Sequence, residues 1–235
     1  TAWQGPLWST FAPLAGAAFT LATAVLLVWD LKHPERFLLI LTRPQWRSWL
    51  VRGAFIITGY SAVLGLHLLA SLLGAGWLAR ALAVAGLPLA AMTAIYTAYL
   101  LAQAKARDLW QSPLLPPHLL VQAVLAGAAI CLPAAAWLEP GLVAPLALLL
   151  AGSAIVHLLL VAGEITLTHA TAHAHLAAKN LTRGPQARAF WTGQALLLGG
   201  IASLAVGPWA APLALAGLAA HEHAYIQAGQ SVPLA

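Results

Sequence analysis

The sequence predicts an all-α integral membrane protein with about seven transmembrane helices. Hydrophobic residues make up 61% of the 235 residues, and charged residues make up only 7%. The mean hydropathy is +0.84. A soluble globular domain carries about 25% charged residues, so this chain cannot cover a soluble surface and most of its surface must face lipid. Soluble enzyme classes are therefore excluded as functions.

Seven apolar segments are each long enough to cross a bilayer, which takes roughly 20 residues. Because backbone polar groups cannot stay unpaired in lipid, each segment should be an α-helix. Barrel strands would be shorter and would alternate in polarity, which these segments do not. We expect a single transmembrane domain over residues 1–235, with helices at 9–30, 50–73, 78–102, 117–138, 141–168, 190–207 and 210–228.

The basic residues predict the orientation of these helices. Ten of the 11 Lys and Arg residues lie in the first, third and fifth connections, and Arg80 alone lies in an even-numbered one. By the positive-inside rule, the basic connections and the C-terminus are cytoplasmic. The net charge of +5 is then a property of one face, which suits lipid headgroups or an acidic partner rather than nucleic acid. Tryptophans near the predicted helix ends should form an interfacial belt, namely Trp29, Trp46, Trp49, Trp77, Trp110, Trp137, Trp191 and Trp209.

Ionisable residues inside membrane spans are candidates for function, because each costs about 2.5–3.5 kcal/mol on insertion scales. Glu164 and His157 lie seven residues apart in the fifth segment, on one helical stripe. A carboxylate and an imidazole at different depths can form a proton relay. The alternative is a buried polar pair that carries no protons. Glu222 and His67 are the other residues that we assign to proton transfer.

Two further histidine patterns allow a cofactor or metal interpretation. His67 and His157 come from different spans and could ligate a haem axially. The stretch "THATAHAH" places His169 and His173 at i and i+4, but zinc sites usually add a carboxylate, a thiolate or a third fixed histidine. The second pattern therefore favours solvated histidines at the membrane surface. The single cysteine, Cys131, excludes a thiolate cluster.

The stretch "DLKHPERF" at residues 30–37 ends the first apolar segment. One interpretation is a helix end among lipid headgroups, with the following residues lying along the membrane surface. The other interpretation is that Asp30 opens a working site. Tyr96 and Glu222 are expected on the same basic side, so several proton-capable groups gather in one third of the membrane.

Four stretches, taken in order, resemble the NrfD/polysulfide-reductase membrane-subunit family. The first contains its Asp-Leu-x-x-Pro-x-Arg-Phe pattern, and the second has a tyrosine followed by a Trp-x-Ser-Pro-Leu-Leu-Pro loop. The last has an Ala-Gly-Gln-x-Val-Pro-Leu ending. They read "DLKHPERFLLILTRPQWRSWLVRGAF", "YTAYLLAQAKARDLWQSPLLP", "HLAAKNLTRGPQARAFWTG" and "EHAYIQAGQSVPLA".

The resemblance implies two four-helix bundles in a bacterial inner membrane. It implies a membrane subunit that exchanges electrons between quinone, menaquinone or ubiquinone, and a docked iron–sulfur subunit of ferredoxin type. That partner would serve a molybdopterin-type or related catalytic subunit. The chain would hold a quinone site but no catalytic centre, and we expect no haem or metal in it. The rival functions are a proton- or ion-coupled transporter, a haem-b anchor and a purely structural anchor.

The resemblance also assigns residues to the quinone site. The matching tyrosine is Tyr96, Trp110 belongs to the loop beside the pocket, and Asp30 and His33 lie at the end of a neighbouring helix. The family's first helix precedes the helix that ends in this aspartate, and it is not visible in this sequence. Part of the pocket is therefore expected to come from outside it.

Overall fold

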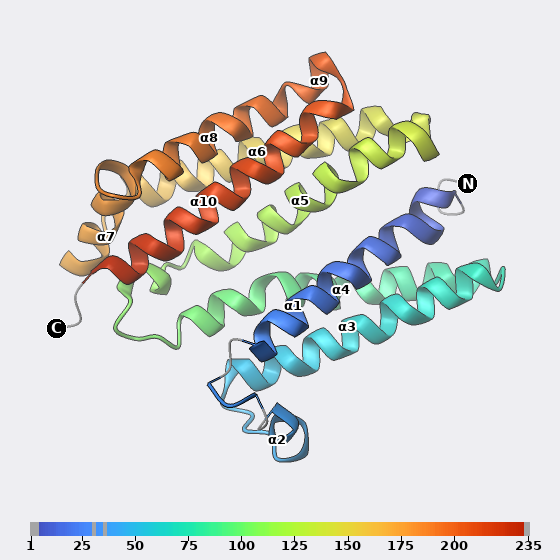
Figure 1. Cartoon of the computed structure of the whole chain (residues 1–235), viewed down its shortest axis with the longest axis horizontal. Coiled ribbons are helices and arrows are strands. Elements are labelled where there is room, and N and C mark those ends of the chain that lie inside the picture. Colours follow the sequence, from blue (N-terminus) through green and yellow to red (C-terminus); the bar gives the residue numbers. More distant parts are fainter. Residues whose placement is uncertain (1–4, 30–31, 35–36, 233–235) are drawn as a thin grey trace. The chain divides into compact units, whose positions relative to one another are not determined.

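The structure is a computed structural model that describes residues 5–29, 32–34 and 37–232. Within these ranges the chain forms helices joined by turns, and it contains no strand (Figure 1). Six helical segments among the described residues are long and apolar enough to cross a membrane, which confirms the all-α membrane class. They are Leu7–Trp29, Trp49–Leu72, Gly76–Leu101, Leu115–Leu138, Pro140–Thr166 and Ala187–Val206.

The seventh predicted span is also a long helix, α10 (Ala211–Ser231). Its stretch "HEHAYIQAGQS" lowers its hydropathy relative to the other six. Each of the seven predicted ranges therefore overlaps one long helical segment.

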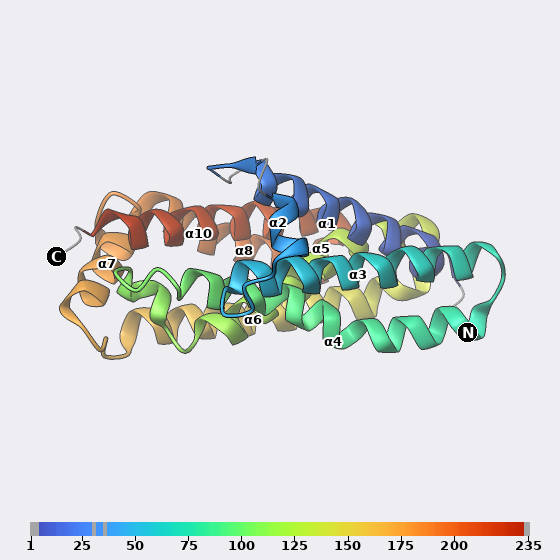
Figure 2. The same ribbon diagram turned by 90° about the horizontal axis from the view of Figure 1, so that it is seen from below.

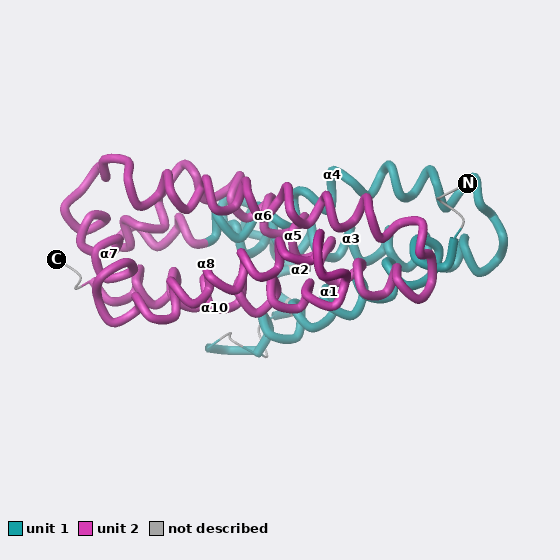
Figure 3. Tube along the Cα trace, turned by 90° about the horizontal axis from the view of Figure 1, so that it is seen from above, with its two compact units in different colours: residues 1–100 teal, residues 101–235 magenta. Residues whose placement is uncertain are grey.

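The chain divides into two compact units, residues 1–100 and residues 101–235 (Figure 3). The first unit contains η2 (Leu7–Phe11), α1 (Ala12–Trp29), α2 (Phe37–Thr42), α3 (Trp49–Leu72) and α4 (Gly76–Leu101). The second contains η4 (Asp108–Gln111), α5 (Leu115–Leu138), η5 (Pro140–Leu142), α6 (Val143–Thr166), α7 (Ala172–Arg183), α8 (Ala187–Ile201), α9 (Ser203–Val206), η6 (Pro208–Ala210) and α10. The last residue of α4, Leu101, belongs to the second unit.

In the first unit, a tight turn at Gly74 joins α3 to α4. Gly74 has a φ of 71°, a left-handed conformation that glycine adopts without a steric penalty. The amide of Ala75 donates to the carbonyl of Ala70 at 2.8 Å, and that of Gly74 donates to Ser71 at 3.1 Å. This bond pattern is a Schellman motif, and it turns the chain so that α4 runs back antiparallel to α3.

Aromatic side chains fill the interface of α3 with α4 near the start of α3. Trp49 stacks on Tyr99 with ring centroids 4.4 Å apart. The ring of Tyr96 lies against Gly53, where a Cβ atom would collide with it. Further along the pair, Gly86 packs against Val63. Glycines opposite large side chains thus set the spacing of the two helices.

In the second unit, four long helices form a closed ring. Helix α5 packs on α6, α6 on α8, α8 on α10, and α10 on α5. Short helices join them, so neighbouring long helices run antiparallel (Figures 1 and 2). This arrangement is a four-helix bundle, and the side chains that face its interior are buried from all sides.

Small residues bring α8 and α10 into backbone contact. A Cβ atom on Gly193 would lie 2.8 Å from the carbonyl oxygen of Gly217, and one on Gly217 would lie 2.7 Å from that of Gly193. Gly200 meets Ala214 in the same way further along. Close crossing of this kind is how apolar helices associate in lipid, where no hydrophobic force drives them together.

The connections at one end of the bundle are fixed by polar contacts. Thr171 caps α7 by accepting from the amide of Ala174 at 3.1 Å, and its hydroxyl donates to Asp108 at 2.5 Å. Arg107 donates to the carbonyls of Gln230 at 2.9 Å and Val232 at 2.7 Å. These bonds therefore fix the η4 turn to α7 and to the end of α10.

Most of the predicted tryptophan belt is present. Exposed tryptophans lie at or near helix ends, as an interfacial belt requires, at Trp29, Trp46, Trp77, Trp137, Trp191 and Trp209. Trp110 is an exception, because it is buried and its ring lies against Gly229 of α10. The loop that carries Trp110 folds back into the unit instead of meeting the headgroups.

Candidate functional site

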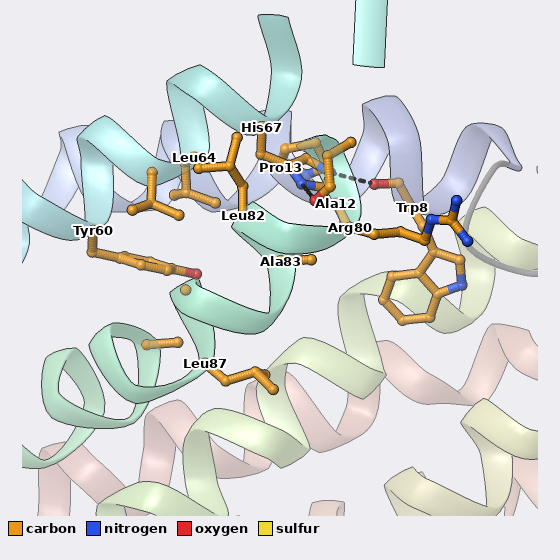
Figure 4. Close-up of a pocket in the computed structure, with 14 residues that line it drawn as sticks. Trp8, Ala12, Pro13, Tyr60, Leu64, His67, Arg80, Leu82, Ala83 and Leu87 are labelled. Carbon is orange, nitrogen blue, oxygen red and sulfur yellow. Dashed lines mark hydrogen bonds between the residues drawn. The ribbon is translucent and has the colours of Figure 1, made fainter. Parts of the chain in front are cut away.

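An apolar cavity of about 390 Å³ lies in the first unit, lined by the start of α1, the second half of α3 and the first half of α4 (Figure 4). Most of its wall is aliphatic. Polar atoms come from Tyr60, His67 and Arg80, and Trp8 adds an indole. Figure 4 shows Tyr60 and Arg80 on opposite sides of the group that lines the cavity. An apolar pocket with a few polar groups is the usual form of a small-molecule site.

His67 is held by backbone atoms. Its Nδ1 lies 3.0 Å from the carbonyl of Ala79, and its Nε2 lies 3.2 Å from the carbonyl of Trp8. Both partners are acceptors, so both ring nitrogens are directed at the protein, and neither is presented to a haem iron in this arrangement. His67 thus links α3 to η2 and to the first turn of α4.

Gly53, Tyr60 and His67 share one stripe of α3, since they are spaced by seven residues. Tyr96 packs at Gly53, whereas Tyr60 and His67 line the cavity. The predicted quinone residue Tyr96 is thus buried at one end of the α3–α4 interface, and the cavity occupies the other end.

The other predicted quinone residues differ in exposure and in the unit to which they belong. Trp110 is buried in the second unit, and His33 is exposed. Asp30 lies outside the described residues. His67, which lines the cavity, was a predicted site residue, whereas Tyr60 and Arg80 were missed because an apolar span gives no sign of which face is hollow. The seven-residue spacing of Tyr60 and His67 puts both on one face of α3, and this was the sequence signal that could have identified Tyr60.

The second unit contains a histidine cluster formed by His118, His157 and His221. They come from α5, α6 and α10, and their exposed fractions are 1%, 0% and 1%. One ring nitrogen of each lies within 4.8 Å of the others. His118 Nε2 lies 2.9 Å from His157 Nδ1, a hydrogen-bond distance. The remaining nitrogen of His157, Nε2, is buried and has no hydrogen-bond partner among the described residues.

Further polar side chains surround this cluster. Glu164 Oε1 lies 3.4 Å from His118 Nδ1, and Gln194 Nε2 lies 3.0 Å from His221 Nδ1. Gln122, one turn after His118 on α5, donates to Glu222 at 2.6 Å. The cluster is therefore the centre of a polar network that reaches all four long helices of the bundle.

A second cavity, of about 420 Å³, connects this network with the end of the bundle. Its walls are the η4 turn, the segment before α7, and the side chains of Glu164 and Tyr225. Tyr225 donates its hydroxyl to the carbonyl of Leu109 at 3.1 Å. Glu164 thus lies between the cavity and the buried histidines.

The predicted proton-transfer residues are divided between the units. Glu164, His157 and Glu222 all lie in or beside the network of the second unit, whereas His67 lies in the first. Nothing in the structure tests proton transfer itself, so these roles stay predictions. Of the two histidines named in the "THATAHAH" stretch, His173 is exposed on α7, whereas His169 is half-buried and lines the second cavity.

Sequence reasoning missed His118, His221, Gln122 and Gln194. His118 follows "LLPP" at a helix start, where a histidine at the membrane surface is the ordinary expectation. His221 precedes Glu222 in the seventh predicted span, and nothing in that span shows which helix it faces. Helices that are apolar all round do not reveal which of their faces meet.

The comparisons with known proteins agree with the fold. No curated protein and no solved structure matches the chain. The model of one family, described as polysulphide reductase, NrfD, matches residues 6–216. That range includes all the long helices up to the first residues of α10, and it confirms the resemblance to this family. Three of the four stretches lie within the range, and the last, at residues 222–235, lies beyond it. The chain therefore belongs to the polysulphide reductase NrfD family.

Proposed function

We propose that this chain is the quinone-reactive membrane subunit of a multi-subunit oxidoreductase. It exchanges electrons between the quinone pool and an iron–sulfur partner, which serves a molybdopterin-type or related catalytic subunit. Family membership over residues 6–216 indicates a membrane subunit of a redox complex, and this observation carries the proposal. The apolar cavity of the first unit supports the quinone part.

The cavity has the properties that a quinone requires. A quinone is an apolar ring with two carbonyl oxygens that accept hydrogen bonds, joined to a long apolar tail. The volume of about 390 Å³ falls within the usual range for ligand pockets. Tyr60 and Arg80 carry O–H and N–H donors for the carbonyl oxygens. The aliphatic wall made by α3 and α4 suits the ring and the first part of the tail.

Tyr96 takes a supporting place in this proposal. It lies six residues beyond Ala90, the last cavity residue of α4, which is about 9 Å along a helix. It therefore shares the α3–α4 interface with the quinone without lining the cavity. By packing on Gly53, it holds the two helices at the distance that keeps the cavity open.

The experiment is quinol-dependent reduction of the iron–sulfur clusters, measured on the complex purified in mild detergent. Ala83 lines the cavity, so Ala83→Leu should fill part of it. We expect the KM for quinol to rise about tenfold, which corresponds to ~1.4 kcal/mol. Ala85→Leu is the matched control, since Ala85 lies on the same helix, is exposed and does not line the cavity.

Two substitutions distinguish the role of Tyr60 from that of Tyr96. Tyr60→Phe removes a hydroxyl at the cavity and should raise the KM, whereas Tyr96→Phe keeps the packing ring and should change it less. If Ala83→Leu and Tyr60→Phe leave the KM unchanged, the quinone binds elsewhere. If the purified chain brings no iron–sulfur partner and shows no quinol-dependent electron transfer, the redox function itself is wrong.

A further inference from the structure

We propose that the histidine cluster of the second unit, His118, His157 and His221, binds one Zn²⁺ ion. This proposal is independent of the quinone site, because it concerns other residues in the other unit. It also departs from the sequence-based expectation that the chain holds no metal. The sequence alone does not show that His118 meets His157 and His221.

The geometry brings three imidazoles together without stacking them. The ring centroids of His118 and His157 lie 4.6 Å apart, and those of His157 and His221 lie 4.8 Å apart at 80°. Ligand nitrogens around a tetrahedral zinc ion, with Zn–N of about 2.0–2.1 Å, are separated by about 3.3 Å. The nitrogens of the cluster are 2.9 Å apart in the closest pair and within 4.8 Å overall. Side-chain movements of about 1 Å would therefore complete the site.

The partners of the outer nitrogens resemble the support that metal-bound histidines receive. A metal-ligating histidine usually gives its other ring nitrogen to a carboxylate or an amide or backbone oxygen, which fixes its orientation. Here Glu164 stands 3.4 Å from His118 Nδ1, and the Gln194 amide stands 3.0 Å from His221 Nδ1. His118 Nε2 and His221 Nε2 would then bind the metal, which takes the place of the hydrogen bond between His118 Nε2 and His157 Nδ1. The Gln194 Oε1 atom has no partner among the described residues, and rotation of the amide would let it accept from Nδ1–H.

The charges around the cluster favour a cation. Glu164 is 8% exposed, and Glu222 lies next to His221 and accepts from Gln122. Ionised carboxylates inside a membrane bundle are expensive unless they are paired. Glu164 lies beside the cluster, so a divalent ion there would balance the charge of its ionised form. Neutral imidazoles alone provide no such compensation.

The ligand type selects the metal. Imidazole nitrogen suits zinc, copper, iron and nickel, whereas magnesium and calcium require oxygen ligands. The sulfur ligands that favour Cu(I) or iron–sulfur clusters are remote, since Cys131 follows His118 by 13 residues on the same helix, about 20 Å along it. Three neutral histidines with a supporting carboxylate are a common zinc arrangement. The second cavity, which reaches Glu164, provides the entry path.

The test is the metal content of the membrane protein, purified with its partners and washed with a chelator that removes loosely bound ions. The iron–sulfur partner carries its own metal, so zinc is counted per chain by mass spectrometry. We expect about one zinc ion per chain, and its loss in His118→Asn, His157→Asn and His221→Asn. His223→Asn is the matched control, because His223 lies on the same helix and is exposed. It should keep the zinc.

Glu164→Gln tests the supporting carboxylate. It should lower the affinity for zinc by about 10–100-fold without removing a ligand. Because a variant may fail to fold, a second measurement uses the unchanged sequence with Co²⁺ in place of zinc. A tetrahedral nitrogen site gives strong visible absorption bands, and added Zn²⁺ should abolish them. Wild-type protein without zinc and without these bands would overturn the proposal, and so would zinc retained equally in all variants. The cluster would then be a hydrogen-bonded histidine network alone.

Discussion

The two units bury their helices to very different extents. In the first unit, 11% of the most apolar window of each of the three spans is buried, whereas the corresponding windows of α5, α6 and α8 are 39%, 44% and 33% buried. All six have similar length and hydropathy. Helices of similar length and hydropathy are therefore buried to different extents. Burial depends on how many helices surround a helix and not on its own composition.

The units also differ in where their polar side chains bond. In the first unit, hydroxyls such as those of Thr20, Ser61 and Thr93 donate to carbonyls one turn back in the same helix. In the second, His118 meets His157, and Gln122 meets Glu222, from different helices. Hydroxyl groups thus bond within their own helix, whereas these four polar side chains of the second unit join different helices. His67 is the counterpart in the first unit, since it contacts carbonyls of η2 and α4.

The largest expected effect is at the α8–α10 crossing. Gly217→Val should destabilise the protein by about 3 kcal/mol, because the new side chain meets backbone atoms that cannot move aside. In the first unit, Gly65 has open space around its Cβ position, and Gly65→Ala should instead stabilise α3 by about 0.5–1 kcal/mol. Unfolding by SDS titration in mixed micelles measures both. Equal changes in stability for the two variants would contradict the conclusion that the second unit is packed more tightly than the first.

The next effect concerns bonds between helices. Gln122→Leu leaves the carboxylate of Glu222 without its donor, so we expect a loss of about 2 kcal/mol. Thr93→Val removes a bond within one helix and should change stability by less than about 0.5 kcal/mol. The same titration compares them. A large loss for Thr93→Val would show that the first unit also depends on polar bonds.

The smallest effect is at the helix caps. Thr171 caps α7 and also binds Asp108, and Thr171→Ala should cost about 1 kcal/mol. Ser48 occupies the same position before α3 but makes no side-chain capping bond, so Ser48→Ala should be nearly neutral. Hydrogen exchange of the first amides of each helix would sharpen this result, since only those of α7 should exchange faster. Faster exchange at α3 after Ser48→Ala would contradict it.

The seven helices could be predicted from hydropathy because a span must satisfy its backbone internally. The sequence also carries local signals at two helix starts, with Pro116 and Pro117 in the first turn of α5 and Gly207-Pro208 shortly before α10. The exposed tryptophans at the helix ends were predictable for a similar reason. These features depend on the lipid environment and on short stretches of sequence.

The histidine cluster could not be predicted in the same way. His157 and Glu164 were found because they share one helix, and their spacing can be read directly. His118 and His221 meet them only because α5 and α10 turn particular faces inward, and those helices are apolar on nearly every side. Rotation about the helix axis is decided by packing, as at Gly193 and Gly217, which no single segment encodes.

Arg107 has a consequence for how the protein is made. Its contacts to residues 230 and 232 join positions 123 and 125 residues apart in the sequence. The turn after α4 is synthesised early, but it acquires these partners only after the end of α10 has left the ribosome and entered the membrane. The second cavity is also completed late, because Tyr225 of α10 lines it together with the η4 turn. A chain that stops before residue 230 would lack both Arg107 contacts, so the turn after α4 would lose its link to the end of α10.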